Sequence, residues 1–135
     1  MTSANQRPKT LKHLRVLVVE DHQDSADLLR HTLNLWGCDA RVCRSGAEAL
    51  DEACRYQPHV ALLDLNLPDI DGCEVGRTLR QQPGLDNMAL VAITGHAEEE
   101  VRRRSSDAGF DLHLRKPFRP DVLHSLLERV EQSAW

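Results

Sequence analysis

Hydrophobic residues along the chain form two kinds of pattern. Residues 16–19, 60–63 and 89–93 are continuous apolar runs, the pattern of strands that are buried on both faces of a sheet. Residues 39–44 and 111–115 alternate between polar and apolar side chains, which indicates strands with one exposed face. The chain is therefore predicted to contain three central strands and two edge strands.

Between these runs, apolar residues recur at the three- and four-residue spacing of amphipathic helices. Helices are predicted over residues 24–36, 45–57, 72–82, 97–108 and 122–130. The buried stripe of the second helix is predicted to be Ala47, Leu50, Ala53 and Cys54. The fourth helix is expected to be lightly anchored, because its stripe consists mostly of small residues: Ala97, Val101, Ser105 and Ala108.

Strands that alternate with helices predict an α/β fold, in which a parallel sheet carries helices on both faces. The alternating second and fifth strands belong at the edges. The expected strand order is therefore 2-1-3-4-5, that of a flavodoxin-like, doubly wound sheet with five helices. The 135 residues suffice for one domain, expected over residues 13–135, and residues 1–12 are expected to form a flexible N-terminal arm.

Composition narrows the classes of function. The 17 Lys and Arg residues against 21 Asp and Glu residues form no clustered basic face, so no nucleic-acid partner is expected. No apolar stretch could span a bilayer and the N-terminus carries no secretory signal, so we expect no membrane association and a cytoplasmic location. The 4 cysteines lack CxxC spacing and are expected to be reduced thiols.

Polar side chains stand where the predicted strands end. Glu20 and Asp21 follow the first strand, Asp64 ends the third, Thr94 follows the fourth and Lys116 follows the fifth. A single aspartate after a strand is more often a turn residue. Because the carboxyl ends of parallel strands meet at one edge of the sheet, however, these five side chains are expected to converge in one crevice.

Three carboxylates in one crevice repel each other, and one lysine does not balance them. A hard divalent cation would, and Mg²⁺ takes oxygen ligands. Asp21 and Asp64 are the expected direct ligands, and Glu20 is expected to act through water or by its charge. The backbone carbonyl of Asn66 could supply a third protein oxygen.

These residue types suit phosphoryl transfer. An aspartate such as Asp64 can attack a phosphoryl group and hold it as an acyl phosphate. Such transfer depends mainly on positioning and charge neutralisation. Lys116 would pair with one phosphoryl oxygen, and the Thr94 hydroxyl would donate a hydrogen bond to another.

Other sites fit the sequence less well. Asp64 begins a D-x-N pattern like that of an EF-hand, but Asp69 stands where that loop needs glycine and Val75 where it needs glutamate. There is no HExxH, Cys/His cluster, G-x-G-x-x-G or Walker A loop, so zinc and nucleotide sites are not expected. An aspartyl-phosphate phosphatase is an enzyme alternative, although such enzymes commonly carry an acid where this chain has Asn66. A scaffold that needs no phosphorylation is a third alternative.

Four motifs resemble those of the receiver domains of two-component response regulators. They are LVVED at 17–21, ALLDLNLPDIDG at 61–72, AITGHA at 92–97 and LRKPF at 114–118, and they occur in the order and spacing of that family. The resemblance implies a phosphorelay. A histidine kinase or a histidine phosphotransfer protein would donate the group from a phosphohistidine. The chain would not be a conventional enzyme, but would catalyse its own Mg²⁺-dependent phosphorylation and slow dephosphorylation.

The resemblance also implies a role for each residue of the crevice. Asp64 would be the phosphoacceptor, Glu20 and Asp21 the acidic pair, Thr94 the switch hydroxyl and Lys116 the pocket lysine. The peptide bond between this lysine and the following proline would be cis.

One position departs from the family pattern. Three residues before Lys116, where the family often has an aromatic residue that turns inward during the switch, this chain has His113, and Phe110 is expected in the core. A histidine here is similar to receivers of hybrid sensor kinases. It is a switch candidate that could add pH sensitivity; a solvated edge-strand histidine is the plainer interpretation.

Output is expected to be carried by a surface. A downstream protein would contact the face formed by the fourth helix, the fifth strand and the fifth helix. Both a free regulator and a receiver within a larger protein agree with the sequence.

Overall fold

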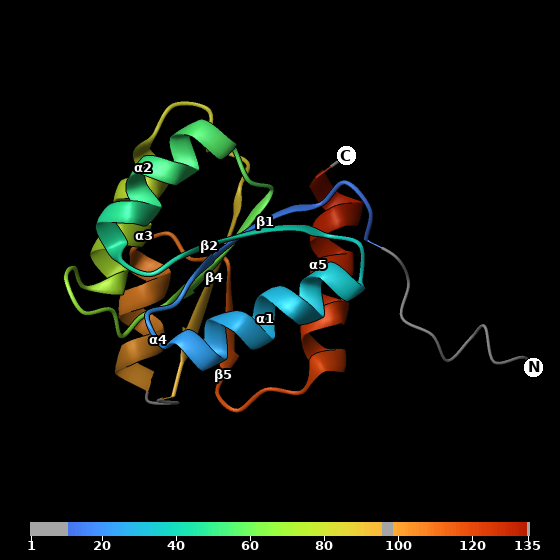
Figure 1. Cartoon of the computed structure of the whole chain (residues 1–135). Helices are drawn as coiled ribbons and strands as arrows, with labels where there is room; N and C mark the ends of the chain where they lie inside the picture. Colours follow the sequence, from blue (N-terminus) through green and yellow to red (C-terminus); the bar gives the residue numbers. More distant parts are fainter. Residues whose placement is uncertain (1–10, 96–98, 135) are drawn as a thin grey trace, which may run out of the picture.

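The structure is a computed structural model of the chain and describes residues 11–95 and 99–134 (Figure 1). Within these ranges, five strands alternate with five helices, as the hydrophobic pattern predicted. Their bounds are β1 Arg15–Val19, α1 Gln23–Leu35, β2 Asp39–Cys43, α2 Gly46–Tyr56, β3 Val60–Asp64, α3 Gly72–Gln81, β4 Ala89–Thr94, α4 Glu99–Asp107, β5 Leu112–Arg115 and α5 Pro120–Ala134.

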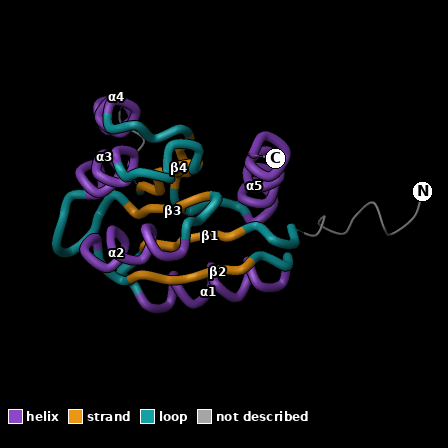
Figure 2. Tube along the Cα trace, turned by 90° about the horizontal axis from the view of Figure 1, so that it is seen from above, coloured by secondary structure: helices purple, strands orange, loops and turns teal. Residues whose placement is uncertain are grey.

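The strands form one parallel sheet in the order β2-β1-β3-β4-β5, which confirms the predicted flavodoxin-like topology (Figure 2). β3 lies at the centre and every one of its residues is buried. In register, Val19 at the end of β1 faces Leu63, and Asp64 at the end of β3 faces Ile93. This register places Asp64 in the middle of the carboxyl edge of the sheet.

Two hydrophobic clusters hold the helices on opposite faces of the sheet. Leu62 of β3 belongs to the cluster that contains Leu33 of α1 and Leu127 of α5. The next residue, Leu63, points to the other face, where it joins Leu79 of α3 in the second cluster. Figure 1 accordingly shows α1 and α5 on one side and α2, α3 and α4 on the other. No described helix combines the length and the apolar character that a membrane span requires.

Helix α2 buries part of the predicted stripe. The prediction is confirmed at Ala53, which is buried, and at Leu50, which is partly buried against the core, but it was wrong at Ala47 and Cys54, which are exposed. The observed stripe also includes Ala49 and Tyr56, and the Tyr56 hydroxyl donates a hydrogen bond to the Asp39 carbonyl oxygen at 2.6 Å. A tyrosine can bury its ring and still satisfy its hydroxyl.

Leu11 belongs to the packed domain and not to the predicted arm. Its side chain is fully buried beside α1 and α5, and its amide donates a hydrogen bond to the Trp36 carbonyl oxygen at 2.7 Å. The predicted boundary after residue 12 was therefore wrong at Leu11. Residues 1–10 lie outside the described part of the chain, so the remainder of the arm stays a prediction.

Helix α4 buries little of its surface against the core, as its predicted stripe of mostly small residues indicated. Among residues 99–107, Ser105 is the buried one. The predicted start of this helix falls on residues 96–98, which lie outside the described part of the chain. The guanidinium of Arg104 reaches across to Asp71, at the start of α3, in an ion pair of 2.9 Å.

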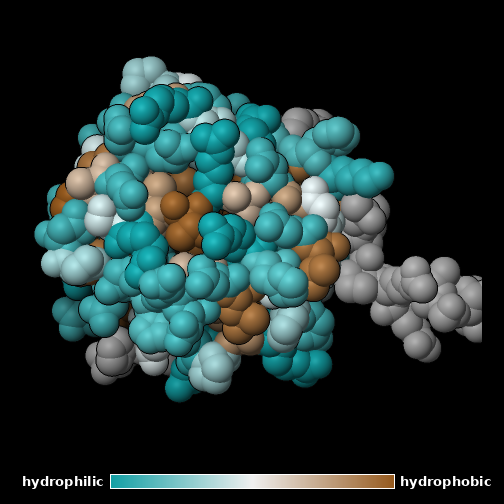
Figure 3. All heavy atoms as spheres, in the orientation of Figure 1, coloured by the Kyte–Doolittle hydropathy of each residue, from teal (hydrophilic) through white to brown (hydrophobic). Residues whose placement is uncertain are grey.

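The face shown in Figure 3 is largely hydrophilic, with apolar patches in its lower half, over the course of α1. Leu28 and Leu35 of this helix are exposed. They lie outside the buried stripe of α1, which consists of Ala26, Leu29 and Leu33.

Gly72 lies where α3 begins against the loop that follows β3. Its amide donates a hydrogen bond to the Leu65 carbonyl oxygen at 3.2 Å, and a Cβ atom at this position would lie 2.5 Å from the Leu65 Cα atom. The loop that follows Asp64 can therefore approach the helix only because residue 72 lacks a side chain.

We expect Gly72→Ala to lower the free energy of unfolding by about 1–3 kcal/mol, because the backbone of Leu65 has to move to admit the methyl group. Urea denaturation followed by circular dichroism measures this. Gly95→Ala is the matched control, since a Cβ there meets no atom of the described residues within 4 Å. Equal losses in the two variants would contradict the prediction.

Candidate functional site

The carboxyl ends of β1, β3, β4 and β5 surround a cavity of about 600 Å³. In Figure 1 this region lies toward the lower edge of the view, where α1 begins and β4 ends. The residues that line it are Glu20, Asp21, His22, Ser25, Asp64, Leu65, Asn66, Asp71, Cys73, Thr94, Gly95, Val101, Arg104 and Lys116. Six of the seven predicted site residues therefore meet in one place, as the topology of a parallel sheet requires.

Three carboxylates form the floor of this cavity. Carboxylate oxygens of Glu20, Asp21 and Asp64 lie within 4.8 Å of one another. Glu20 and Asp64 are 3% and 5% exposed, whereas Asp21 is the most accessible of the three. Buried carboxylates this close together destabilise each other unless a cation lies between them.

Lys116 supplies that positive charge. Its Nζ atom lies 2.8 Å from Asp64 Oδ2 and 3.0 Å from Glu20 Oε1. Burial by itself would lower the pKa of Lys116, but the hydrogen bonds to Asp64 and Glu20 and their negative charges outweigh burial and raise it. The lysine therefore stays protonated at neutral pH. The bond from Lys116 to Pro117 is cis, as the resemblance implied.

Backbone amides aim the two buried carboxylates. Asp64 Oδ1 accepts a hydrogen bond from the Asn66 amide at 2.8 Å, and Glu20 Oε2 accepts one from the His22 amide at 3.1 Å. In each residue one carboxylate oxygen thus accepts a hydrogen bond from the backbone amide two residues later, while the other faces Lys116. Both carboxylates are oriented before any ligand arrives.

Thr94 and Asn66 also line the cavity. Thr94 is buried at the end of β4, and its carbonyl oxygen accepts a hydrogen bond from the Lys116 amide at 2.8 Å. This bond places the threonine and the lysine side by side at the edge of the sheet. The predicted chemical roles of these residues stay predictions, although their predicted convergence is observed.

His113 does not line the cavity. It is half-buried on β5, and its Nε2 atom forms a hydrogen bond with the Ser105 hydroxyl of α4. Burial, followed by the nearby charge of Arg102, lowers the pKa of His113. Phe110 lies in the core, as expected. The histidine thus joins β5 to α4 outside the cavity.

The Asp71–Arg104 ion pair at the wall of the cavity was not anticipated from the sequence. Asp71 also caps α3 by accepting a hydrogen bond from the Cys73 amide at 2.8 Å. Burial alone would raise the pKa of Asp71, but this bond and Arg104 lower it. The two residues lie 33 positions apart, and no local pattern of the sequence indicates that they pair.

The donor set of the cavity fits Mg²⁺. Carboxylate oxygens of three of its acids lie together, and among the described residues this candidate cluster includes no thiolate or imidazole. Hard oxygen ligands are those that Mg²⁺ prefers, and it commonly keeps several waters. The cavity of about 600 Å³ leaves room for them, and Asp21 in its lining is exposed.

Known proteins are similar to this chain in sequence and in fold. The sensor protein EvgS of Escherichia coli (strain K12) is 32% identical over 130 residues, which cover 96% of this chain and 11% of that protein. This chain thus spans a small part of the length of that relative. The chemotaxis response regulator CheY4 of Vibrio cholerae has a TM-score of 0.82 at 28% identity, covering 87% of this chain and 98% of that one.

A third likeness concerns a metal. The receiver domain of the sensor histidine kinase PA1611 from Pseudomonas aeruginosa PAO1 was solved with a magnesium ion coordinated in its active site cleft. It has a TM-score of 0.82 at 27% identity, covering 88% of this chain and 98% of that one.

The family model of the response regulator receiver domain matches residues 16–128, which include every residue that lines the cavity and all five strands except Arg15 at the start of β1. Sequence, topology and the acidic cavity agree with that match. The chain belongs to the response regulator receiver domain family of two-component signalling.

Proposed function

We propose that Asp64 accepts a phosphoryl group from the phosphohistidine of a histidine kinase or a histidine phosphotransfer protein. The observation that carries this proposal is the position of the Lys116 ammonium, 2.8 Å from Asp64 and 3.0 Å from Glu20, at the edge of an open acidic cavity. A carboxylate that is buried, oriented by the backbone and paired with a cation is well placed to act as a nucleophile.

In the proposed transfer, a carboxylate oxygen of Asp64 forms a bond to phosphorus while the phosphorus–nitrogen bond of the donor breaks. The electron pair of that bond returns to the imidazole, and an acyl phosphate remains on Asp64. Lys116 moves its hydrogen bond from the carboxylate to a phosphoryl oxygen, and the Thr94 hydroxyl donates a hydrogen bond to another. Water later attacks phosphorus and releases inorganic phosphate.

Asp21, Asp64 and the Asn66 carbonyl would hold the Mg²⁺ ion, with Glu20 acting through water or by charge. When bound, the ion neutralises negative charge on the acids and the phosphoryl group. Because Asn66 stands two residues after the nucleophile, where a phosphatase commonly has an acid, we expect slow hydrolysis of the acyl phosphate. The chain would not be a conventional enzyme.

The donor would approach over α1. A second cavity of about 470 Å³ lies between this helix and the segment after β5, and it shares Glu20, Ser25 and Lys116 with the acidic cavity. Leu28 of α1 lines it. An apolar surface beside the nucleophile suits a protein donor. We expect neither a nucleic-acid nor a membrane partner, and the free thiols of the described cysteines agree with a cytoplasmic location.

Phosphorylation would be transmitted through α4. Thr94 ends the strand that leads toward this helix, and α4 is held by few contacts: buried Ser105, its bond to His113 and the Arg104–Asp71 ion pair. A change at Thr94 and Lys116 would therefore shift α4 relative to β5 at small cost. We propose that a downstream protein contacts the face formed by α4, β5 and α5.

Incubation with acetyl phosphate and Mg²⁺ is expected to add one phosphate to the protein, as measured by intact mass. Omission of Mg²⁺ or the substitution Asp64→Asn should abolish the adduct. Asp51→Asn is the matched control, because Asp51 is an exposed aspartate of α2 away from the cavity. An adduct that persists in Asp64→Asn, or well-folded wild type that is never modified by acetyl phosphate or a kinase, would contradict the proposal.

The proposed switch predicts a change in amide hydrogen exchange. With Mg²⁺ and beryllofluoride, a mimic of the phosphoryl group, peptides from α4 and β5 should alter their deuterium uptake, because Thr94 and Lys116 would reorient toward the new charge. Asp64→Asn protein in the same solution is the control. Unchanged uptake across both elements, together with demonstrated binding of the mimic, would rule out this surface as the output.

The low pKa of His113 predicts a pH dependence of stability. The unfolded chain takes up a proton on this histidine near pH 6.5, which the folded protein resists, so the stability present above that pH is lost as the pH falls. We expect His113→Phe to lose less unfolding free energy than wild type between about pH 7.5 and about pH 5.5 in urea denaturation. His31→Phe, at an exposed position of α1, is the control. Parallel pH profiles for wild type and His113→Phe would contradict this.

A further inference from the structure

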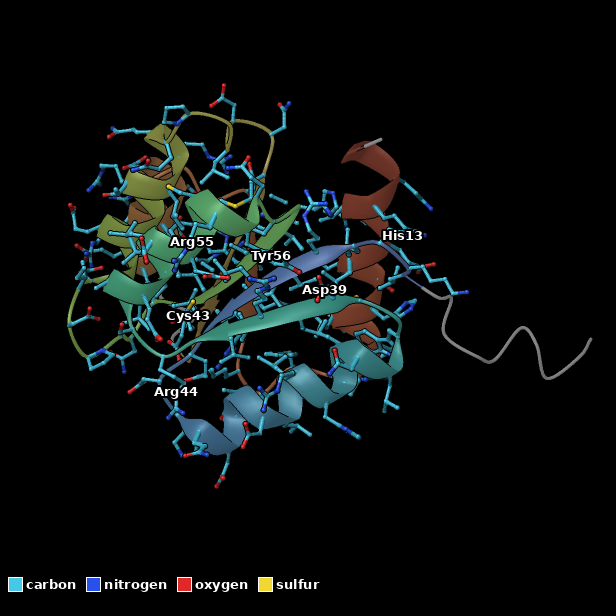
Figure 4. All side chains as sticks on the ribbon, turned by 45° about the horizontal axis from the view of Figure 1, so that its top comes forward. His13, Asp39, Cys43, Arg44, Arg55 and Tyr56 are labelled. Atoms are coloured by element: carbon cyan, nitrogen blue, oxygen red, sulfur yellow. The ribbon has the colours of Figure 1, made fainter. Side chains whose placement is uncertain are left out.

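An arginine outside the predicted site holds the acidic loop that follows β1. The guanidinium of Arg44 donates two hydrogen bonds to the main-chain carbonyl oxygen of Asp21, from Nη2 at 2.6 Å and from Nε at 3.2 Å. Figure 4 shows Arg44 where β2 leads into α2, beside the beginning of α1. A planar guanidinium that binds one oxygen through two donors restricts that oxygen more than a single bond would.

Arg44 is itself held in a rigid corner. Its amide donates a hydrogen bond to Glu48 Oε1 at 2.7 Å, while the Glu48 amide donates one to Ser45 Oγ at 3.2 Å. This reciprocal pair at the start of α2 is a capping box, displaced by one residue. Next to it, the Cys43 carbonyl oxygen accepts a hydrogen bond from the Glu20 amide at 3.0 Å. The guanidinium therefore extends from backbone that has little freedom.

The same corner is joined to the loop that follows β3. Asp69 accepts hydrogen bonds from the Gly46 amide at 2.9 Å and from the Ala47 amide at 3.0 Å. These two bonds lower the pKa of Asp69, so the connection persists at neutral pH. The corner thus contacts both loops that carry the proposed metal ligands, one through Asp21 and one through the segment after Asp64.

We infer that Arg44 is a positioning residue for the Mg²⁺ site, acting through the backbone of Asp21. This inference rests on the proposed function, because it assigns Asp21 as a ligand. Asp21 is the most accessible of the three acids, and among the described residues no amide holds its carboxylate as the backbone amides hold those of Glu20 and Asp64. Its position therefore depends on its main chain, which Arg44 holds.

Electrostatics alone makes the opposite prediction, which allows a clear test. Arg44 is a cation near a cation site, so if only its charge mattered, its removal would tighten Mg²⁺ binding. If it positions Asp21, its removal weakens binding, because the free ligand then has to be ordered when the ion arrives. The sign of the change in affinity distinguishes the two effects.

Titration of the full chain with MgCl₂ in an isothermal calorimeter measures this affinity. We expect the dissociation constant to rise about tenfold in Arg44→Ala, as for other residues that hold metal ligands in place. Arg44→Lys should lie between Arg44→Ala and wild type, because an ammonium can restore one of the two bonds to the carbonyl. Arg55→Ala, which removes the same charge from an exposed position on α2, should bind as wild type does or slightly more tightly.

Hydrogen exchange without metal gives a second measurement. Amides of residues 20–22 should exchange faster in Arg44→Ala than in wild type or Arg55→Ala, and saturating Mg²⁺ should restore phosphorylation of Arg44→Ala by acetyl phosphate. If wild type binds Mg²⁺ and Arg44→Ala binds it equally or more tightly, the positioning role of Arg44 is overturned, while the proposed metal site stands. A wild-type protein that binds no Mg²⁺ would overturn the proposed metal site, and the inference with it.

Discussion

The pairing of one ammonium with two buried carboxylates is the interaction on which the rest of this structure depends. Asp64 and Glu20 lie almost wholly inside the protein, and Lys116 binds both of them. Without a cation their charges would repel each other at a cost that a small domain cannot easily bear. Because that one ammonium leaves an excess of negative charge, the cavity remains suited to a divalent ion and to the transfer of an anionic group.

The fold serves this arrangement through short-range constraints on the backbone. The strand order brings the ends of β1, β3 and β5 to one edge, and amides two residues past Asp64 and Glu20 turn their carboxylates toward Lys116. Gly72 lets the loop after Asp64 lie against α3. Arg44 holds the backbone of Asp21, the remaining acid, through hydrogen bonds to its carbonyl oxygen. Chemistry and stability are thus set by the same hydrogen bonds.

The output side of the molecule is built differently. Helix α4 is held by polar contacts, the His113–Ser105 hydrogen bond and the Arg104–Asp71 ion pair, where α1 and α5 are held by a large apolar cluster. Polar contacts of this kind are individually weak and can exchange partners, whereas a packed core resists displacement. A helix anchored in this way, next to the cavity, is the part of the domain that a small change in charge could move.

The sequence by itself determined the fold class, the strand order and the convergence of Glu20, Asp21, Asp64, Thr94 and Lys116. Continuous and alternating apolar runs follow directly from how many faces of a strand are buried, and strand ends of a parallel sheet must meet. Only the tertiary structure decided which side chains of different elements meet: Arg44 with Asp21, Arg104 with Asp71, and His113 with Ser105. It also decided the burial of Tyr56 and Leu11. These contacts depend on side-chain direction and on how closely elements far apart in the chain approach each other. Neither produces a periodic pattern in the sequence.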